Sequence, residues 1–360
     1  MAVDAVVLGG GLAGLTVLSV LQTHTPPTSR LCLFDPLLNE TPRRLPEGLF
    51  YLRATEDMLQ FFKENLPGVT FDTRRVRGGI FSEGRVVPRG EAHQEFGSRL
   101  YQELRILYTQ KTRNLPYPQA LELYSTAMND PDSEVGSPFV GGEERRILVS
   151  PGEYAELLTA RALQDSRVQL ICDGIVELGV KVPHRILGSE LLYEETNSVF
   201  STVPLPSLYK MLCRQSPVHR CRKLMVMSVR LGNDHRFDDY DYVYFPAPGD
   251  GRMHRIAVRS LRTNMWDFEI GYDTSAGPPS VGEVFKSLAA FPDLSVGGFV
   301  HATVGLAGHL LPTVVGVDED PLPASVHPVG RFAQWDSRMT LDRVARRARD
   351  LVRGGRADGR

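Results

Sequence analysis

The first 36 residues constrain the fold more than any other stretch of the chain. Residues 5–8 are a short apolar run typical of a buried parallel strand, and glycine follows at positions 9, 10, 11 and 14. Residues 12–21 contain no proline and can continue as a helix. Residues 31–34 form a second apolar run that ends at Asp35. This order predicts strand, glycine turn, helix and strand at the head of a Rossmann-like α/β unit.

Each part of the pattern has a role in binding a dinucleotide. In G-x-G-x-x-G, Gly9 permits the tight turn, Gly11 lets a pyrophosphate approach the backbone, and Gly14 lets helix and strand pack closely. The helix N-terminus offers N–H groups and a positive dipole end to the phosphates. Asp35 follows the glycines by about 20 residues, where an acid can accept a hydrogen bond from a ribose 2′-OH. The pattern predicts a dinucleotide site; the alternative is a glycine-rich turn in an unrelated α/β protein.

Composition narrows the class of protein further. A chain of 360 residues is long for one compact unit, so we expect two connected domains. The net charge of −2 argues against a dedicated nucleic-acid or membrane-surface binder. The four cysteines show no C-x-x-C spacing, which favours reduced thiols in a cytoplasmic protein without a metal cluster. We expect no signal peptide, because the N-terminal apolar run lacks a basic n-region, carries Asp4 and has glycines where the apolar h-region should be. We expect no membrane span, because no apolar stretch reaches about 20 residues.

Periodicity and capping residues predict the remaining elements. Thr55 can cap a helix over residues 56–65, whose apolar positions form one face. Residues 75–81 and 85–87 alternate as a hairpin, with Glu83 and Gly84 near its turn. Further helices are expected over residues 91–131, 151–163 and 279–290, and at the C-terminus. Residues 223–273 predict an antiparallel sheet.

Three further stretches carry a family resemblance together with the glycine segment. They are GLFYLRATEDMLQFFKENLPGVTFDTRRVRGGIFSEGRVVP, SVFSTVPLPSL and VGRFAQWDSRMTLDRV, which begin at residues 48, 198 and 329. In this order they resemble the flavin-dependent amine oxidase superfamily. Within it, the likeness is to the branch of UDP-galactopyranose mutase-like and protoporphyrinogen oxidase-like proteins.

The resemblance implies an α/β fold, α+β overall, with FAD as cofactor. A Rossmann-like FAD-binding domain would comprise residues 1–88, 146–208 and 318–360. An interleaved substrate-binding domain, built on an antiparallel sheet and helices, would comprise residues 89–145 and 209–317. The implied FAD-binding residues are Gly9, Gly11, Leu12, Ala13, Gly14, Asp35 and Pro36 for the ADP half, Ile175 or Val176 for the adenine, Gly330, Arg331 and Trp335 near the pyrophosphate, and Asp342 at the helix beside the flavin.

One departure from the family pattern bears on the reaction. The mutases carry a histidine beside the flavin, in a stretch where this chain has Phe50 and Arg53. This weakens a mutase assignment and makes Arg53 a candidate for binding substrate. The other candidate catalytic residues lie in the predicted substrate sheet and in the loop before the final flavin strand: Tyr244, Arg255, Arg259 and His309.

The expected function is that of an FAD-dependent oxidoreductase of the amine-oxidase type, with O2 reoxidising the flavin. It would remove a hydride from a carbon bonded to nitrogen. Basic residues outnumber acids over residues 209–262, which indicates either a solvated face or an anionic substrate: a carboxylate, a nucleotide or DNA. An amino-acid-like group on a nucleotide or on a modified DNA base would fit. Two alternatives stay open, a redox-neutral sugar-nucleotide mutase and a non-catalytic nucleotide-binding module, and the sequence leaves the oligomeric state undetermined.

Overall fold

The structure of the protein is a computed structural model. It describes residues 3–38, 52–113, 115–127, 144–189, 192–214, 219–231, 237, 239–247, 253–260, 265–272, 279–280, 282–283, 296–303, 309–314, 321–331, 333–334 and 339–357. Most of the helix expected over residues 279–290 lies outside this part.

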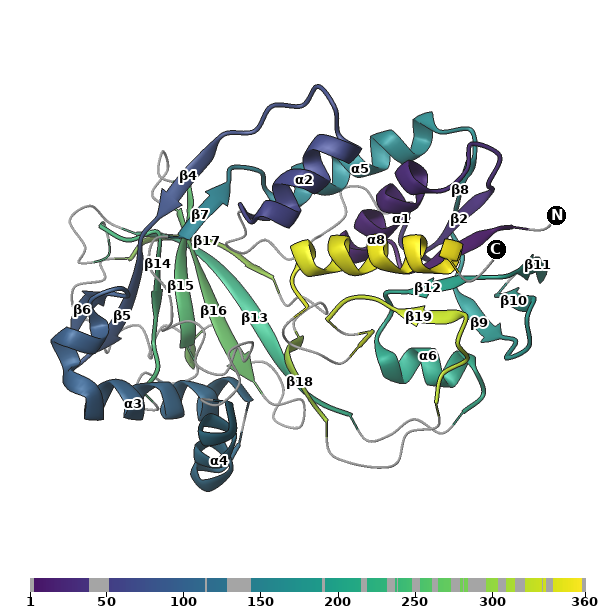
Figure 1. The fold of residues 1–360 in the computed structure, drawn as a ribbon. Helices are drawn as coiled ribbons and strands as arrows, with labels where there is room; N and C mark the ends of the chain where they lie inside the picture. The colour runs from purple at the N-terminus through teal and green to yellow at the C-terminus, as the bar shows by residue number, and fades with distance from the viewer. Residues whose placement is uncertain are drawn as a thin grey trace.

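A five-stranded parallel sheet contains the glycine segment (Figure 1). Its order is β19 (Val326–Pro328), β12 (Val199–Ser201), β1 (Ala5–Leu8), β2 (Leu31–Phe34) and β8 (Val168–Ile171). The strand β12 from the middle of the chain and β19 from its end lie on one side of β1, in parallel register. The expected Rossmann-like unit is thereby confirmed.

Both faces of the parallel sheet are covered, as the apolar character of its strands requires. Successive strand residues point to opposite faces, so Ala5 and Val7 pack into one core while Val6 and Leu8 pack into another. On the first face lie α1 (Leu12–His24), α2 (Glu56–Asn65), α5 (Pro151–Gln164) and α8 (Leu341–Ala357). On the second lie α6 (Leu205–Met211) and an antiparallel sheet of β9 (Ile175–Leu178), β10 (His184–Gly188) and β11 (Leu192–Thr196).

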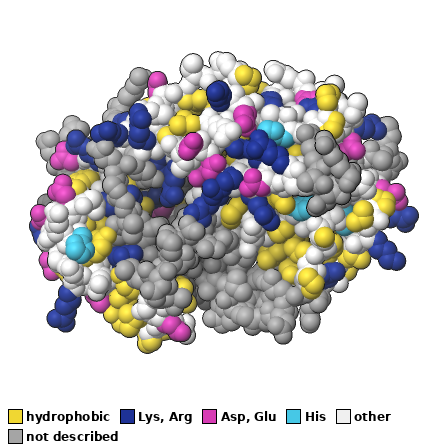
Figure 2. Space-filling view, in the orientation of Figure 1, with side chains coloured by type: hydrophobic (Ala, Val, Ile, Leu, Met, Phe, Trp, Pro, Cys, Tyr) yellow, Lys and Arg dark blue, Asp and Glu magenta, His cyan; other side chains and the backbone are white. Residues whose placement is uncertain are grey.

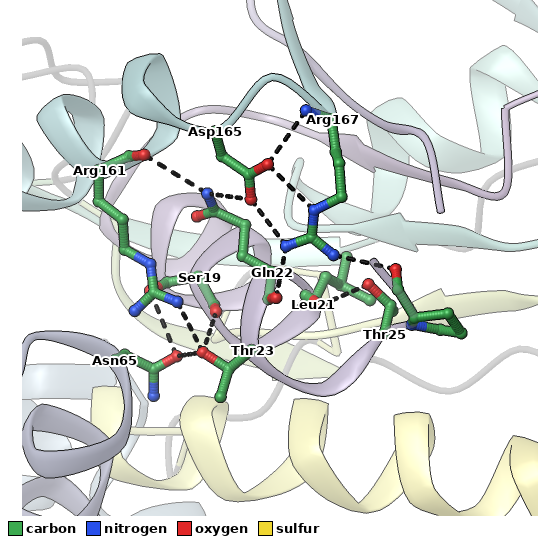
Figure 3. Close-up of polar contacts among 10 residues, drawn as sticks. Ser19, Leu21, Gln22, Thr23, Thr25, Asn65, Arg161, Asp165 and Arg167 are labelled. Atoms are coloured by element: carbon green, nitrogen blue, oxygen red, sulfur yellow. Dashed lines mark hydrogen bonds and ion pairs between the residues drawn. The ribbon is translucent and has the colours of Figure 1, made fainter. Parts of the chain in front are cut away.

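Polar side chains hold the C-terminal half of α1 between α2 and α5 (Figure 3). The Thr23 hydroxyl donates to Asn65 Oδ1 of α2 at 2.7 Å and accepts from Arg161 Nη2 of α5 at 2.7 Å. Asp165, which ends α5, accepts from Gln22 Nε2 at 3.1 Å and from Arg167 Nη2 at 2.7 Å. These bonds fix the direction of α1 and therefore the position of the glycine turn at its start.

The second large sheet has eight strands and is almost entirely antiparallel. The expected sheet over residues 223–273 is part of it. Its order is β17 (Val296–Thr303), β13 (His219–Leu231), β16 (Met265–Tyr272), β15 (Met253–Ser260), β14 (Tyr242–Tyr244), β5 (Gly78–Ser82) and β6 (Arg85–Pro88), with β18 (His309–Val314) pairing with β13. Strands β5 and β6 thus hydrogen-bond in this sheet, within a range that the sequence suggested for the first domain.

The helix α3 (Ala92–Arg113) packs on the second sheet and α4 (Tyr117–Ala127) packs against α3, in the region expected to be helical. Lys111 in α3 donates to the carbonyl oxygens of Phe245 and Ala247, both at 2.9 Å. No helix in the described part of the chain is long and apolar enough to cross a membrane.

A small antiparallel sheet of β3 (Leu52–Arg53), β7 (Glu144–Ile147) and β4 (Thr73–Val76) joins the two large sheets. The sequence predicted one strand over residues 75–81; the hairpin pairing with residues 85–87 is confirmed by β5 and β6, but the single strand was wrong, because residues 73–76 form β4 in the small sheet. The chain changes sheets at Arg77, whose N–H donates to Asp241 Oδ2 at 2.7 Å and whose carbonyl accepts from Asp241 N–H. The turn expected at Glu83 and Gly84 is confirmed, with φ angles of 52° and 74°.

Candidate functional site

The glycine turn is shaped by contacts within the protein at two of its glycines. Gly9 has a φ of +92°, and a Cβ there would lie 2.7 Å from Thr202 Oγ1. A Cβ on Gly14 would lie 1.7 Å from the carbonyl oxygen of Gly9. Thr202 follows β12 and donates its hydroxyl to the Leu8 carbonyl at 2.8 Å, so this threonine holds the turn. Any side chain at Gly9 or Gly14 would displace the backbone of the turn.

Gly11 is different, because a Cβ there would meet no atom within 4 Å. Gly11 is the exposed N-cap residue of α1, and no side chain caps this helix. An uncapped helix N-terminus presents N–H groups and a positive dipole end. The fold therefore leaves Gly11 without an internal steric reason to be glycine, and the open space beside it is where a phosphate would approach.

Asp35 lies at the end of β2, next to this turn. Its Oδ2 accepts from the Gly10 N–H and its Oδ1 from the Leu37 N–H at 2.8 Å. Each carboxylate oxygen has two lone pairs, so the half-buried group can also accept from a ribose hydroxyl. Pro36 follows at the surface, where its carbonyl contacts Cys172 Sγ at 3.4 Å.

The two residues proposed for the adenine differ in exposure. Ile175 packs partly buried against the core on the second face of the parallel sheet. Val176 is 57% exposed. Of the pair, the structure leaves Val176 more accessible to a ligand.

The C-terminal segment returns to the glycine turn. Gly330 is buried with a φ of +117°, and a Cβ there would lie 3.3 Å from the Ala13 Cβ in the first turn of α1. The Val329 N–H donates to Ser201 of β12 at 2.8 Å, which anchors the segment. Gly330 thus lies beside a residue that precedes it by more than 300 positions. Trp335 lies outside the described residues.

Asp342 connects the start of α8 to the start of α2. Its Oδ2 accepts from the Thr55 hydroxyl at 3.2 Å, while Thr55 Oγ1 accepts from the Met58 N–H and caps α2 as predicted. Figure 1 shows this end of α8 directed toward the second large sheet. Arg53, two residues before Thr55, is exposed on β3 in the same region.

Tyr244 and Arg255 are adjacent across β14 and β15. The Arg255 guanidinium lies 5.9 Å from the centre of the Tyr244 ring and binds both carboxylate oxygens of Glu269, with Nε to Oε2 at 3.0 Å. Burial lowers the pKa of Arg255, but the charge of Glu269 outweighs it and the net pKa is raised. Arg255 therefore stays charged and engaged with Glu269, and its planar group orients the Tyr244 ring.

Tyr108 of α3 completes this cluster. Its ring centre lies 5.5 Å from that of Tyr244 in an edge-to-face arrangement. Burial raises the pKa of Tyr108 well above its usual value, so the phenol stays neutral. The other two candidates are described by their backbone alone: Arg259 lies in β15, and His309 lies in β18 opposite Lys223.

Sequence reasoning missed several residues of this region. Thr202 lies within the SVFSTVPLPSL stretch, but only the fold shows its contact with Gly9. Arg74 and Arg146 belong to two Arg-Arg pairs in the sequence, at 74–75 and 145–146. Each pair is next to a residue of the Thr73–Ile147 pair, which is opposed across β4 and β7. The repeated Arg-Arg dipeptide is a sequence signal that could have drawn attention to Arg74 and Arg146.

Comparison with known proteins establishes the fold. No family model and no curated protein sequence matches the chain. Reduced UDP-galactopyranose mutase has a TM-score of 0.65 at 12% identity, covering 100% of this chain and 95% of the mutase. A triple mutant of putrescine oxidase has a TM-score of 0.64 at 12% identity, and cyclohexylamine oxidase from Brevibacterium oxydans IH-35A has 0.64 at 10%, each covering 99% of both chains. The chain shares the fold of these proteins, as the resemblance to the flavin amine oxidase superfamily implied.

Proposed function

We propose that this protein binds FAD and is a flavin-dependent oxidoreductase. The observation that carries the proposal is the difference among the three motif glycines. The fold itself requires glycine at Gly9 and Gly14, whereas Gly11 faces open space at the uncapped start of α1. A pyrophosphate approaching that helix end would occupy this space and explain why residue 11 is glycine.

The C-terminal contacts favour FAD over a nicotinamide dinucleotide. Gly330, which precedes Arg331, lies beside the first turn of α1. Asp342 links the start of α8 to Thr55, and this end of α8 is directed toward the second sheet (Figure 1). A cofactor longer than its ADP half would extend from the glycine turn toward this second helix end. The residues present fit FAD, with the glycine turn and Asp35 toward the ADP end and α8 toward the flavin.

We infer an amine-oxidase type of reaction on an anionic substrate. When bound, FAD supplies an acceptor for a hydride from a carbon bonded to nitrogen. The protein's own residues would bind and orient the substrate: Arg53 as a fixed cation, and Tyr244 as an aromatic surface held by Arg255 and Tyr108. The positive end of α8 would stabilise negative charge near its start. The names of two structural neighbours, putrescine oxidase and cyclohexylamine oxidase, refer to amines.

The alternative is a redox-neutral enzyme on a sugar nucleotide, because UDP-galactopyranose mutase shares the fold. Arg53 replaces the histidine of the mutase stretch and argues against this alternative. An amine group linked to a nucleotide or to a DNA base would also supply an anion for this site, and its oxidation would follow the same reaction.

The absorption spectrum of the purified protein tests the cofactor. We expect flavin absorption, release of FAD on denaturation, and bleaching by an amine substrate without oxygen. Oxygen consumption with that substrate would separate an oxidase from a mutase. A colourless protein that binds nicotinamide nucleotides would overturn the proposal.

A further inference from the structure

Two buried hydroxyl groups connect α5 to the first turn of α1. The Tyr154 hydroxyl lies 2.8 Å from Thr16 Oγ1, and Thr16 Oγ1 donates to the Leu12 carbonyl oxygen at 2.7 Å. A threonine hydroxyl has one hydrogen, and Thr16 gives it to Leu12, so Tyr154 is the donor to Thr16. The hydrogen bonds therefore run in one direction, from Tyr154 through Thr16 to the carbonyl group of Leu12. We call Tyr154 and Thr16 the hydroxyl pair.

The hydroxyl pair is fully enclosed by the core of the nucleotide-binding unit. Tyr154 and Thr16 are both 0% exposed. The Tyr154 ring packs edge-to-face against Phe61 and Phe62 of α2, with ring centres 6.2 and 5.7 Å away, and this packing fixes the direction of its hydroxyl. Burial raises the pKa of the Tyr154 phenol well above its usual value, so the group keeps its proton and stays a donor.

Stability of the core does not by itself account for the hydroxyl pair. Two hydrogen-bonded hydroxyl groups can be replaced by apolar groups of the same shape at almost no cost in stability. A threonine that bonds to the carbonyl four residues before it also weakens a helix slightly and bends it. The hydroxyl pair thus sets the conformation of the first turn of α1 rather than strengthening the helix.

The bonds end at a peptide group that faces the glycine turn. The Leu12 carbonyl and the Ala13 N–H are the two ends of one planar peptide group. The helix begins at Leu12, and the Leu15 N–H bonds to the Gly11 carbonyl at 3.0 Å. The Ala13 N–H therefore has no acceptor inside the helix and points past its start. Donors at the carbonyl end polarise the peptide group, which makes its N–H a stronger donor.

We propose that Tyr154 and Thr16 are positioning residues for the diphosphate of the bound dinucleotide. They would act through the Leu12–Ala13 peptide group, which they hold in one orientation and whose N–H they strengthen toward a phosphate oxygen beside Gly11. The inference rests on the proposed function, because it concerns the site of the same cofactor. It adds two residues that belong neither to the glycine motif nor to the positions implied by the family resemblance.

The test is the dissociation constant of FAD, measured by dialysis of the full-length holoprotein. The same measurement is made with ADP, which carries the diphosphate without the flavin. We expect Thr16→Val to raise both dissociation constants by about fivefold and Tyr154→Phe by about threefold. The double variant should bind no more weakly than Thr16→Val alone, because Tyr154 acts only through Thr16. Thr16→Ser keeps the hydroxyl and should bind FAD within about twofold of wild type.

The matched control lies at the other end of the same helix. Thr25 Oγ1 donates to the Leu21 carbonyl at 2.7 Å, four residues before it, as Thr16 does to Leu12 (Figure 3). Thr25→Val removes this bond far from the glycine turn and should leave FAD binding within about 1.5-fold of wild type. All these substitutions are neutral, so attraction of an anionic cofactor to the Lys and Arg side chains gathered around α8 is the same in every variant (Figure 2).

Thermal unfolding separates positioning from packing. Thr16→Val leaves the Tyr154 hydroxyl buried without an acceptor and should lower the thermal midpoint. At the same FAD concentration, the double variant should unfold at a higher temperature than Thr16→Val, because it removes both hydroxyl groups. Its FAD binding should nevertheless stay weak. If FAD binding recovered together with the midpoint, the hydroxyl pair would be a packing feature only and the inference would be wrong.

The results with FAD and ADP distinguish this inference from the proposed function. Wild type that binds FAD, with Thr16→Val and Tyr154→Phe binding it equally well, would retain the function and overturn the inference. Wild type that binds ADP but no FAD, with weaker ADP binding in both variants, would reject the flavin and retain the role of the hydroxyl pair. Wild type that binds neither compound would reject both.

Discussion

Gly11 and Gly14 belong to one motif but are glycine for different reasons. We expect Gly14→Ala to destabilise the protein by about 3 kcal/mol or more, because its Cβ would lie 1.7 Å from the Gly9 carbonyl oxygen. Gly11→Val should leave the apo protein's thermal midpoint nearly unchanged and abolish most FAD occupancy. Thermal denaturation of both variants and FAD absorbance per protein check this. Full FAD occupancy in Gly11→Val would show that the phosphate does not approach here.

Arg53 is the single residue that we expect to affect catalysis most directly. We expect Arg53→Ala to lower kcat/KM by about 30- to 1000-fold, equivalent to roughly 2–4 kcal/mol of a charge-assisted hydrogen bond to the substrate anion. Arg53→Lys should recover part of the loss, because an ammonium lacks the planar fork. Steady-state kinetics of the two variants provide the measurement. If Arg53 served only α2, through Glu56 or Asp57, kcat/KM would stay within a few-fold of wild type.

At the scale of elements, the junction of α1 and α5 should make stability depend on pH. Hydrogen bonds from Arg167 lower the pKa of Asp165 to about 2. Because the pKa of Asp165 is lower in the folded than in the unfolded state, the carboxylate stabilises the folded protein at pH values above its unfolded-state pKa of about 3.9. This contribution is lost as pH falls toward 2. The Asp165 side chain is 18% exposed, so we expect about 1–2 kcal/mol after screening.

Urea unfolding of wild type and Asp165→Asn from pH 7 to pH 2.5 measures this contribution. The difference in unfolding free energy should be largest near neutral pH and shrink below pH 4. Asp350→Asn, at an exposed position on α8, serves as the control and should show little difference at any pH. If the difference in unfolding free energy between wild type and Asp165→Asn stayed constant from pH 7 to pH 2.5, the charge of Asp165 would contribute nothing to stability.

At the scale of the whole molecule, Asp241 joins the small sheet to the second large sheet. Its carboxylate, 6% exposed, pairs with Arg74 and accepts from the Arg77 N–H. We expect Asp241→Ala to lower the free energy of unfolding by about 1–3 kcal/mol, because it leaves the part-buried Arg77 N–H and the half-exposed Arg74 cation without this acceptor. Asp241→Asn should lose less, since its amide oxygen still accepts from Arg77. Denaturant unfolding checks the order, with the exposed Asp239→Ala expected within about 0.5 kcal/mol of wild type.

The sequence by itself determined the local elements of the nucleotide-binding unit. Residues 5–8 and 31–34 are strands because an uninterrupted apolar run suits a sheet covered on both faces. The helix over residues 56–65 was predicted with its bounds, because Thr55 and the helical spacing are signals that act within one turn. The helix beginning at residue 151 follows the Ser150–Glu153 capping box for the same reason.

Only the tertiary structure decided which distant segments meet. The split of residues 73–82 between two sheets depends on Asp241, more than 150 positions away. Likewise, the pairing of Arg255 with Glu269 depends on the register of two strands. The opposition of Arg53, Arg146 and Arg74 depends on three segments that no local signal connects. A one-residue slip in any of these registers would turn the side chains to the opposite face. Packing of the whole core selects among such registers. The glycine turn could be predicted because its signals lie within one short segment, whereas the side chains of the candidate substrate site come from distant strands and could not.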